Sequence, residues 1–165
     1  QFAKVERGEG SDPYEVAHTI ALNALVTRAK SKGELLAHLK TRGVEDDIAQ
    51  AVVFRLQETG LINDREFAAA WATSRHSHKK LSKRIIAGEL RQKGVTQEQI
   101  DEALEGIDDE SEYRAAFDLG FKKYNTMSRL EADVQIRRIQ SLLARKGFGF
   151  GVINRVLREL DLINC

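Results

Sequence analysis

Apolar residues recur along most of the chain at intervals of three and four, which is the spacing of one face of an α-helix. The helical segments meet at a junction of a basic residue, a glycine and an apolar residue that occurs three times: Arg42-Gly43-Val44, Lys93-Gly94-Val95 and Lys146-Gly147-Phe148. The three glycines are 51 and 53 residues apart. A junction that recurs at nearly constant spacing predicts an internal repeat of about fifty residues.

The residues around each glycine predict a pair of helices. Large apolar side chains lie four and eight residues before it: Leu39 and Leu35, Leu90 and Ile86, Leu143 and Ile139. The apolar pattern resumes after it, six, ten and thirteen residues on, with Ala49, Val53, Leu56, Ile100, Leu104, Ile107, Ile153, Leu157 and Leu160. The glycine suits the left-handed position that ends a helix, and the basic residue before it complements the negative end of the helix dipole.

A third amphipathic helix precedes each pair. Its apolar face is made by Ala17, Ile20, Ala21, Ala24 and Leu25 in the first repeat, by Phe67, Ala70 and Trp71 in the second, and by Tyr113, Ala116, Phe117, Gly120, Phe121 and Tyr124 in the third. Capping-box spacings predict helix starts at Ser31, Thr96 and Ser128, with a similar start at Asn63. The sequence therefore predicts an all-α protein of three tandem three-helix repeats, 14–60, 61–108 and 109–161. We expect these repeats to form an elongated, curved array that follows a flexible leader over residues 1–13.

Composition agrees with an all-helical fold. The chain of 165 residues is 42% hydrophobic and 31% charged, and it contains a single proline. No apolar run approaches the length of a membrane span, and no secretory signal opens the sequence, so we expect a soluble cytoplasmic protein. The one cysteine, Cys165, excludes an intrachain disulfide and a cysteine-based zinc site.

The net charge of +1 conceals a segregation of charge along the chain. Residues 75–93 contain seven bases and one acid, residues 98–112 contain eight acids and no base, and residues 122–146 contain seven bases and two acids. Solvated helix faces account for any one such block. Three blocks of alternating sign favour surfaces that recognise a charged partner.

The sequence offers little chemistry for an enzyme. The only close histidine pair, His76 and His78, is flanked by Arg75, Lys79 and Lys80, whose charges repel a metal cation. The glycines at 147–151 follow a predicted helix instead of a strand, which is not the setting of a phosphate-binding loop. The acidic run 108–110 lacks calcium-loop spacing and is interpreted as a linker or helix start. We therefore predict no catalytic residues, no metal and no cofactor.

Basic residues at helical spacing are the strongest candidates for a binding surface. Lys80, Arg84 and Arg91 are predicted to share one side of the middle helix of the second repeat, and Arg138 and Arg145 one side of its counterpart in the third. Such cationic ridges suit phosphate oxygens or an acidic protein groove, although solubility alone also explains exposed charges. The candidate residues are Arg75, Lys79, Lys80, Lys83, Arg84, Arg91, Lys93, Arg137, Arg138, Arg145 and Lys146. Trp71 is expected to pack in the core, with stacking on a base as the alternative.

Two stretches of the second repeat, GLINDREFA at 60–68 and ELRQKGV at 89–95, closely resemble the RecX family of bacterial recombinase regulators. The resemblance extends more loosely over about residues 14–160. It implies three tandem three-helix repeats without enzymatic activity. It also implies binding along the groove of the RecA nucleoprotein filament, binding to DNA, and restraint of recombination, ATP hydrolysis and coprotease action. Many relatives have a Gly-Pro pair in the turn where this chain has residues 80–83, which affects the expected geometry of that turn.

The resulting hypothesis is a non-enzymatic modulator of RecA, expected to be a negative regulator of recombination, DNA repair and the SOS response. Its expected partners are the RecA filament and single-stranded DNA, with double-stranded DNA as a further candidate, and it is expected to act as a monomer. Members of the family differ in whether they inhibit or assist the recombinase. The alternatives are an autonomous helical DNA-binding module, which the near-neutral net charge disfavours, and a purely protein-binding helical scaffold.

Overall fold

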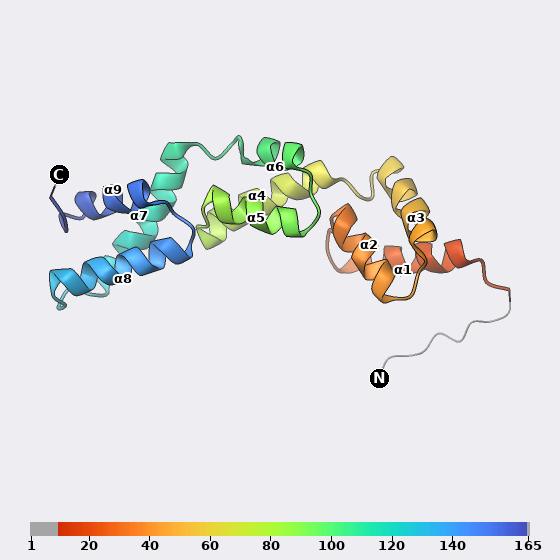
Figure 1. Cartoon of the computed structure of the whole chain (residues 1–165), viewed down its shortest axis with the longest axis horizontal. Helices are drawn as coiled ribbons and strands as arrows, with labels where there is room; N and C mark the ends of the chain where they lie inside the picture. The colour runs from red at the N-terminus through yellow and green to blue at the C-terminus, as the bar shows by residue number, and fades with distance from the viewer. Residues whose placement is uncertain (1–9, 165) are drawn as a thin grey trace. The chain divides into compact units, whose positions relative to one another are not determined.

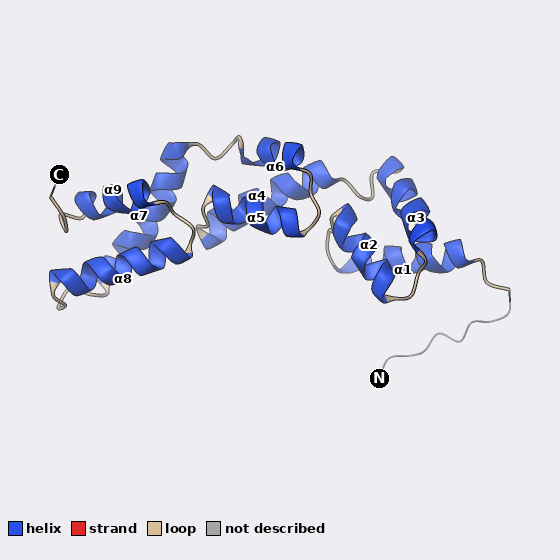
Figure 2. Cartoon of the chain, in the orientation of Figure 1, coloured by secondary structure: helices blue, strands red, loops and turns tan. Residues whose placement is uncertain are grey.

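The computed structural model describes residues 10–164, and every regular element in that part of the chain is an α-helix (Figures 1 and 2). The helices are α1 (Pro13–Thr27), α2 (Lys32–Thr41), α3 (Asp46–Glu58), α4 (Asp64–Lys79), α5 (Lys83–Gln92), α6 (Gln97–Leu104), α7 (Asp109–Asn125), α8 (Ala132–Arg145) and α9 (Phe150–Glu159). The predicted all-α class of tandem three-helix repeats is confirmed. Most of the leader predicted over residues 1–13 lies outside the described residues.

The chain divides into two compact units. The first unit contains the chain up to Phe67 together with the turn Lys93–Val95. Its three complete helices, α1, α2 and α3, pack against one another in pairs. The fully buried side chains at their centre include Ala17, Ala21, Leu35, Leu39, Val52 and Val53. These are the positions that the helical spacing places on the inner faces, so burial of one apolar stripe from each helix stabilises the unit.

The second unit contains residues 68–92 and the chain from Thr96 onward. Helix α5 packs on α6, and α7, α8 and α9 pack on one another in pairs, as Figure 1 shows for the three helices nearest the C-terminus. The core among α7, α8 and α9 includes Ala116, Ile139, Leu143, Val156 and Leu157, all fully buried. Ile86, Leu90 and Ile100 are the fully buried residues of α5 and α6.

The repeated glycine junction has the predicted geometry. Gly43, Gly94 and Gly147 have φ values of 80°, 78° and 91°, the left-handed conformation that a residue without a Cβ adopts at low cost. After Gly43 and Gly147 the next backbone N–H donates to the carbonyl four residues before the glycine, Val44 to Leu39 and Phe148 to Leu143. Those hydrogen bonds close the preceding helix.

Helix starts were predicted well at three of four positions. The Thr96 hydroxyl and the Gln99 side chain form both hydrogen bonds of a capping box. The Ser31 hydroxyl accepts a hydrogen bond from the Glu34 N–H, and the Asn63 side chain accepts one from the Glu66 N–H. The predicted start at Ser128 is wrong, because α8 begins at Ala132.

The position of that start has a physical explanation. The backbone N–H of Leu130 donates to the Met127 carbonyl, which closes a turn where the helix was expected. The buried Gln135 then donates its Nε2–H to the same carbonyl at 2.7 Å. Two donors thus hold residues 127–130 as a turn.

Two further expectations need correction. Lys80 does not lie on the middle helix of the second repeat, because it occupies the turn between α4 and α5 with φ of 54°. Ala70 is exposed, and the buried alanines of α4 are Ala68 and Ala72. Trp71 is partly buried, in contact with Arg75. Among the described helices, none has the length and apolar character needed to cross a membrane.

Candidate cationic interface

Helix α8 presents the clearest cationic face. Its buried side is formed by Gln135, Ile139 and Leu143, whereas Arg137, Arg138 and Arg145 are exposed. At 100° per residue, these three arginines fall within about a third of the helix circumference, opposite the buried side. Within residues 10–164, no carboxylate forms an ion pair with any of them. Their guanidinium groups therefore remain available to an external anion.

The second cationic face belongs to α5 and the end of α4. Arg84 and Arg91 are exposed, lie seven residues apart and point to the same side of α5. The Arg91 Nε–H donates to the side-chain oxygen of Gln97 at 3.1 Å, a neutral acceptor that leaves its charge uncompensated. Lys79 ends α4 and is also exposed. These residues repeat, on a second helix, the arrangement found on α8.

Four of the predicted residues are instead engaged by carboxylates. Arg75 donates from Nε and Nη2 to the two carboxylate oxygens of Glu89, at 3.0 and 2.5 Å, and its guanidinium lies 5.4 Å from the centroid of the Trp71 ring. The ammonium groups pair at 3.5–3.6 Å: Lys80 with Asp118, Lys83 with Asp109, and Lys93 with Glu34. A bidentate pair such as Arg75–Glu89 holds its arginine in a fixed geometry, so Arg75 links α4 to α5 through its side chain.

The structure also brings together residues that sequence reasoning left apart. The turn between α4 and α5 contacts the turn between α8 and α9: the Ser82 N–H donates to the Lys146 carbonyl at 3.0 Å, and Arg84 Nη2 lies 3.5 Å from the Gly147 carbonyl oxygen. Ser82 is completely buried. Cations about sixty residues apart in sequence therefore converge. The sequence does contain a signal for this contact that was not used. A Ser-Lys pair, Ser31-Lys32 or Ser82-Lys83, begins twelve residues before the junction glycine of each of the first two repeats.

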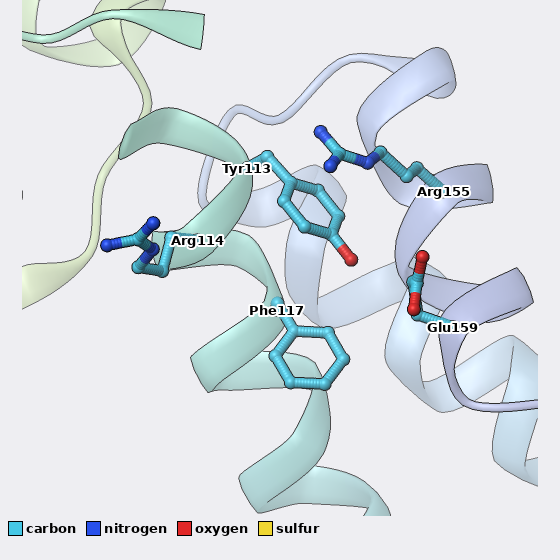
Figure 3. Close-up of a pocket in the computed structure, with 5 residues that line it drawn as sticks. All are labelled: Tyr113, Arg114, Phe117, Arg155 and Glu159. Carbon is cyan, nitrogen blue, oxygen red and sulfur yellow. The ribbon is translucent and has the colours of Figure 1, made fainter. Parts of the chain in front are cut away.

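An open pocket of about 330 Å³ lies between α7 and α9 and is lined by Tyr113, Arg114, Phe117, Arg155 and Glu159 (Figure 3). The Arg155 guanidinium lies 3.5 Å from the centroid of the Tyr113 ring, and its Nη1 is 3.1 Å from a Glu110 carboxylate oxygen. Burial, followed by the charge of Glu159, raises the pKa of the Tyr113 hydroxyl. The phenol is therefore protonated at neutral pH.

The described residues contain no group of three or more histidine, cysteine or acidic side chains that could hold a metal ion. His76, the best histidine candidate, has its Nδ1 3.2 Å from the Leu81 carbonyl oxygen. That contact places the ring at the α4–α5 turn as a packing and hydrogen-bonding group.

A chain of tandem three-helix repeats, in which the middle helices of the second and third repeats expose arginine, defines a class of modular, all-helical protein. Comparison with known families then identifies it: profiles described as the first, second and third three-helix domains of RecX match residues 17–56, 63–104 and 109–157. The chain belongs to the RecX family.

Relatives agree with this assignment, and a solved structure shares the fold. The "Regulatory protein RecX" of Streptomyces coelicolor is 39% identical over 158 residues, which are 95% of this chain and 84% of that protein. The protein of the same name from Mycolicibacterium smegmatis is 40% identical over 139 residues, 81% of this chain and 73% of that protein. The crystal structure of RecX from Lactobacillus salivarius has the same fold, with a TM-score of 0.80 over 92% of this chain and 99% of that one at 24% identity.

Proposed function

We propose that this protein is a non-enzymatic negative regulator of RecA, active in recombination, DNA repair and the SOS response, that binds in the groove of the RecA–DNA filament. Its relatives are named regulatory proteins, and its described residues present cationic helix faces. The observation that carries the proposal is the face of α8, where Arg137, Arg138 and Arg145 are exposed without a carboxylate partner among residues 10–164.

The physical basis is electrostatic. Exposed guanidinium groups bind phosphate oxygens or carboxylates through charge-assisted hydrogen bonds, which fix position more than sequence. Several modest contacts on successive repeats add up when they are held on one chain. Contacts that fit one conformation of the filament better than another shift the filament toward that conformation, which is how a protein without catalytic groups regulates an ATPase.

The test reverses two charges on α8. We expect R138E/R145E to lose inhibition of the RecA ATPase on single-stranded DNA and to bind preassembled filaments at least about tenfold more weakly, since each charged hydrogen bond contributes about 1.5 kcal/mol or more. The matched control is K40E/R55E, which changes the net charge equally at two exposed positions outside the predicted surface.

Wild-type behaviour of a folded R138E/R145E protein would refute the assignment of this face. Equal loss in both double variants would indicate a general charge effect and would count against it too. Equal affinity of the wild-type protein for bare DNA and for filaments would support the autonomous DNA-binding module instead.

A further inference from the structure

Two turns of the chain are held by the same arrangement of residues. In the first unit, the buried Ser31 hydroxyl donates to the Lys93 carbonyl at 2.6 Å. In the second unit, the buried Ser82 donates its backbone N–H to the Lys146 carbonyl at 3.0 Å. Each serine directly precedes a middle helix, and each carbonyl belongs to the basic residue of a basic-glycine junction. We call the Ser82–Gly147 contact the latch.

An aspartate completes each arrangement. Asp64 begins α4 and accepts a hydrogen bond from the Lys32 N–H at 2.7 Å. Asp109 begins α7 and lies 3.6 Å from the Lys83 ammonium. The Lys83 backbone N–H donates to Glu112 at 3.1 Å, so carboxylates of the following repeat contact the lysine after each serine, although through partly different atoms. Such a recurrence indicates that the contacts are part of the repeat and not an accident of one turn.

The latch leaves no space for a side chain at its glycine. A Cβ added to Gly147 would lie 2.3 Å from the Ser82 hydroxyl oxygen and 2.2 Å from Ile85 Cγ1. Gly43 is the same junction without a latch: its φ is 80°, and an added Cβ would meet nothing within 4 Å. A comparison of substitutions at Gly147 and Gly43 therefore separates the effect of the contact with Ser82 from the effect of left-handed backbone geometry.

The latch gathers cations from both sides. Arg84 comes from α5, with its Nη2 3.5 Å from the Gly147 carbonyl oxygen, and Arg145 and Lys146 come from the end of α8. Three residues beyond Gly147, Phe150 begins α9 with 76% of its surface exposed, between two glycines whose own Cβ positions would be open. An exposed aromatic ring beside clustered cations is the combination that holds single-stranded nucleic acid, because the cations bind the phosphates and the ring stacks on a base.

We propose that the latch assembles a binding site for single-stranded DNA, in which Arg84, Arg145 and Lys146 contact phosphates and Phe150 stacks on a base. This site deepens the proposed function and rests on it for its biological role. Ser82 and Gly147 are positioning residues: they hold the two sets of cations in one surface.

The first experiment uses F150A and an oligo(dT) strand without RecA, followed by fluorescence anisotropy at several salt concentrations. We expect an affinity loss of about tenfold with an unchanged salt dependence, because stacking releases no counterions. The control is F54A, which removes another exposed phenylalanine, 61% exposed on α3, and is expected to bind like the wild type. Both side chains are largely exposed, so neither variant threatens folding.

Wild-type binding by F150A overturns the proposal. So does a loss of affinity for RecA without DNA while oligonucleotide binding is retained, which would make this a protein-binding surface. If F150A loses DNA binding while the wild-type protein leaves the RecA ATPase unchanged, the site stands and the proposed function fails.

The second experiment compares G147A with G43A. We expect G147A to reduce the dependence of log affinity on log salt by about 0.7 for each phosphate contact that the separated cations lose, and G43A to leave it unchanged. Circular dichroism confirms that both remain helical. An equal reduction in both variants, or none in a folded G147A, refutes the role of the latch.

Discussion

Among single residues, Glu34 shows how tertiary contacts decide what a charged side chain does. Its carboxylate, 14% exposed, pairs with the Arg28 guanidinium and lies 3.5 Å from the Lys93 ammonium. Burial alone would raise the pKa of this carboxyl. The hydrogen bond from Arg28, the charges of Lys93 and Arg28 and a backbone hydrogen bond from Ser31 outweigh burial, so the pKa lies below its ordinary value.

This lowered pKa predicts a pH-dependent contribution to stability. A carboxyl whose pKa is lower in the folded state stabilises the fold above its ordinary pKa, and the contribution disappears as the pH falls through the lowered value. We expect E34Q to reduce the free energy of unfolding by about 1–3 kcal/mol at pH 7. The difference between E34Q and wild type should shrink below about pH 4.

Urea unfolding at several pH values measures that difference. The control is E58Q, whose exposed pair with Arg55 at 3.8 Å contributes less than about 1 kcal/mol. A difference between E34Q and wild type that is independent of pH would show that the effect is one of shape and not of charge.

The ion-pair partners of individual residues were the feature of the structure that the sequence predicted least well. Lys93 was expected to bind an external anion, and its ammonium lies beside Glu34, fifty-nine residues earlier. Arg75 was expected to do the same and is held by Glu89 on the next helix. Helical periodicity predicts on which side of a helix a residue lies, but the partner on a neighbouring helix depends on packing that periodicity does not contain.

The helices and their buried faces were much more predictable from the sequence than the ion-pair partners. The apolar residues at fixed distances from each glycine are buried as expected, except for the partly buried Leu104, because helix faces follow from spacing and helix ends from glycine. The exception at Ser128 lies beside a tertiary contact, because the buried Gln135 donates to the Met127 carbonyl, which also accepts from the Leu130 N–H and closes a turn there. Local capping preferences compete with such tertiary hydrogen bonds.

Two glycines inside helices lead to opposite predictions. Alanine in place of glycine ordinarily stabilises a helix by about 0.5–1 kcal/mol, and we expect this gain for G88A in α5, where an added Cβ meets nothing within 4 Å. In α2, a Cβ on Gly33 would lie 2.6 Å from the Lys93 carbonyl oxygen. We therefore expect G33A to be destabilising by about 1–3 kcal/mol despite the better helix former.

Thermal unfolding of the two variants provides the measurement, with melting temperatures moving in opposite directions. An increase for G33A as large as that for G88A would mean that the Lys93 turn yields freely, and would weaken the interpretation of the buried Ser31 contact as a fixed part of the repeat.

For the whole molecule, the distribution of charged residues among the repeats is more informative than the net charge. A net charge of +1 implies little long-range attraction for DNA. The cations that count are those left without a carboxylate partner among residues 10–164. Six of the eleven predicted residues are exposed and meet that condition: Lys79, Arg84, Arg91, Arg137, Arg138 and Arg145. The sequence predicted the cationic helices, and only the folded chain separates these six from the paired ones.

This division predicts the salt dependence of binding to single-stranded DNA. If these six residues and the partly buried Lys146 each neutralise a phosphate, log affinity falls with log salt with a slope of about −5, and R138A/R145A reduces its magnitude by about 1.4. R75A should leave the slope unchanged while lowering stability, since Glu89 then loses both of its hydrogen bonds. Titrations of oligo(dT) between low and physiological salt test both variants. A change of slope in R75A as large as that of one α8 arginine would show that pairing within the fold does not withdraw a cation from the binding surface.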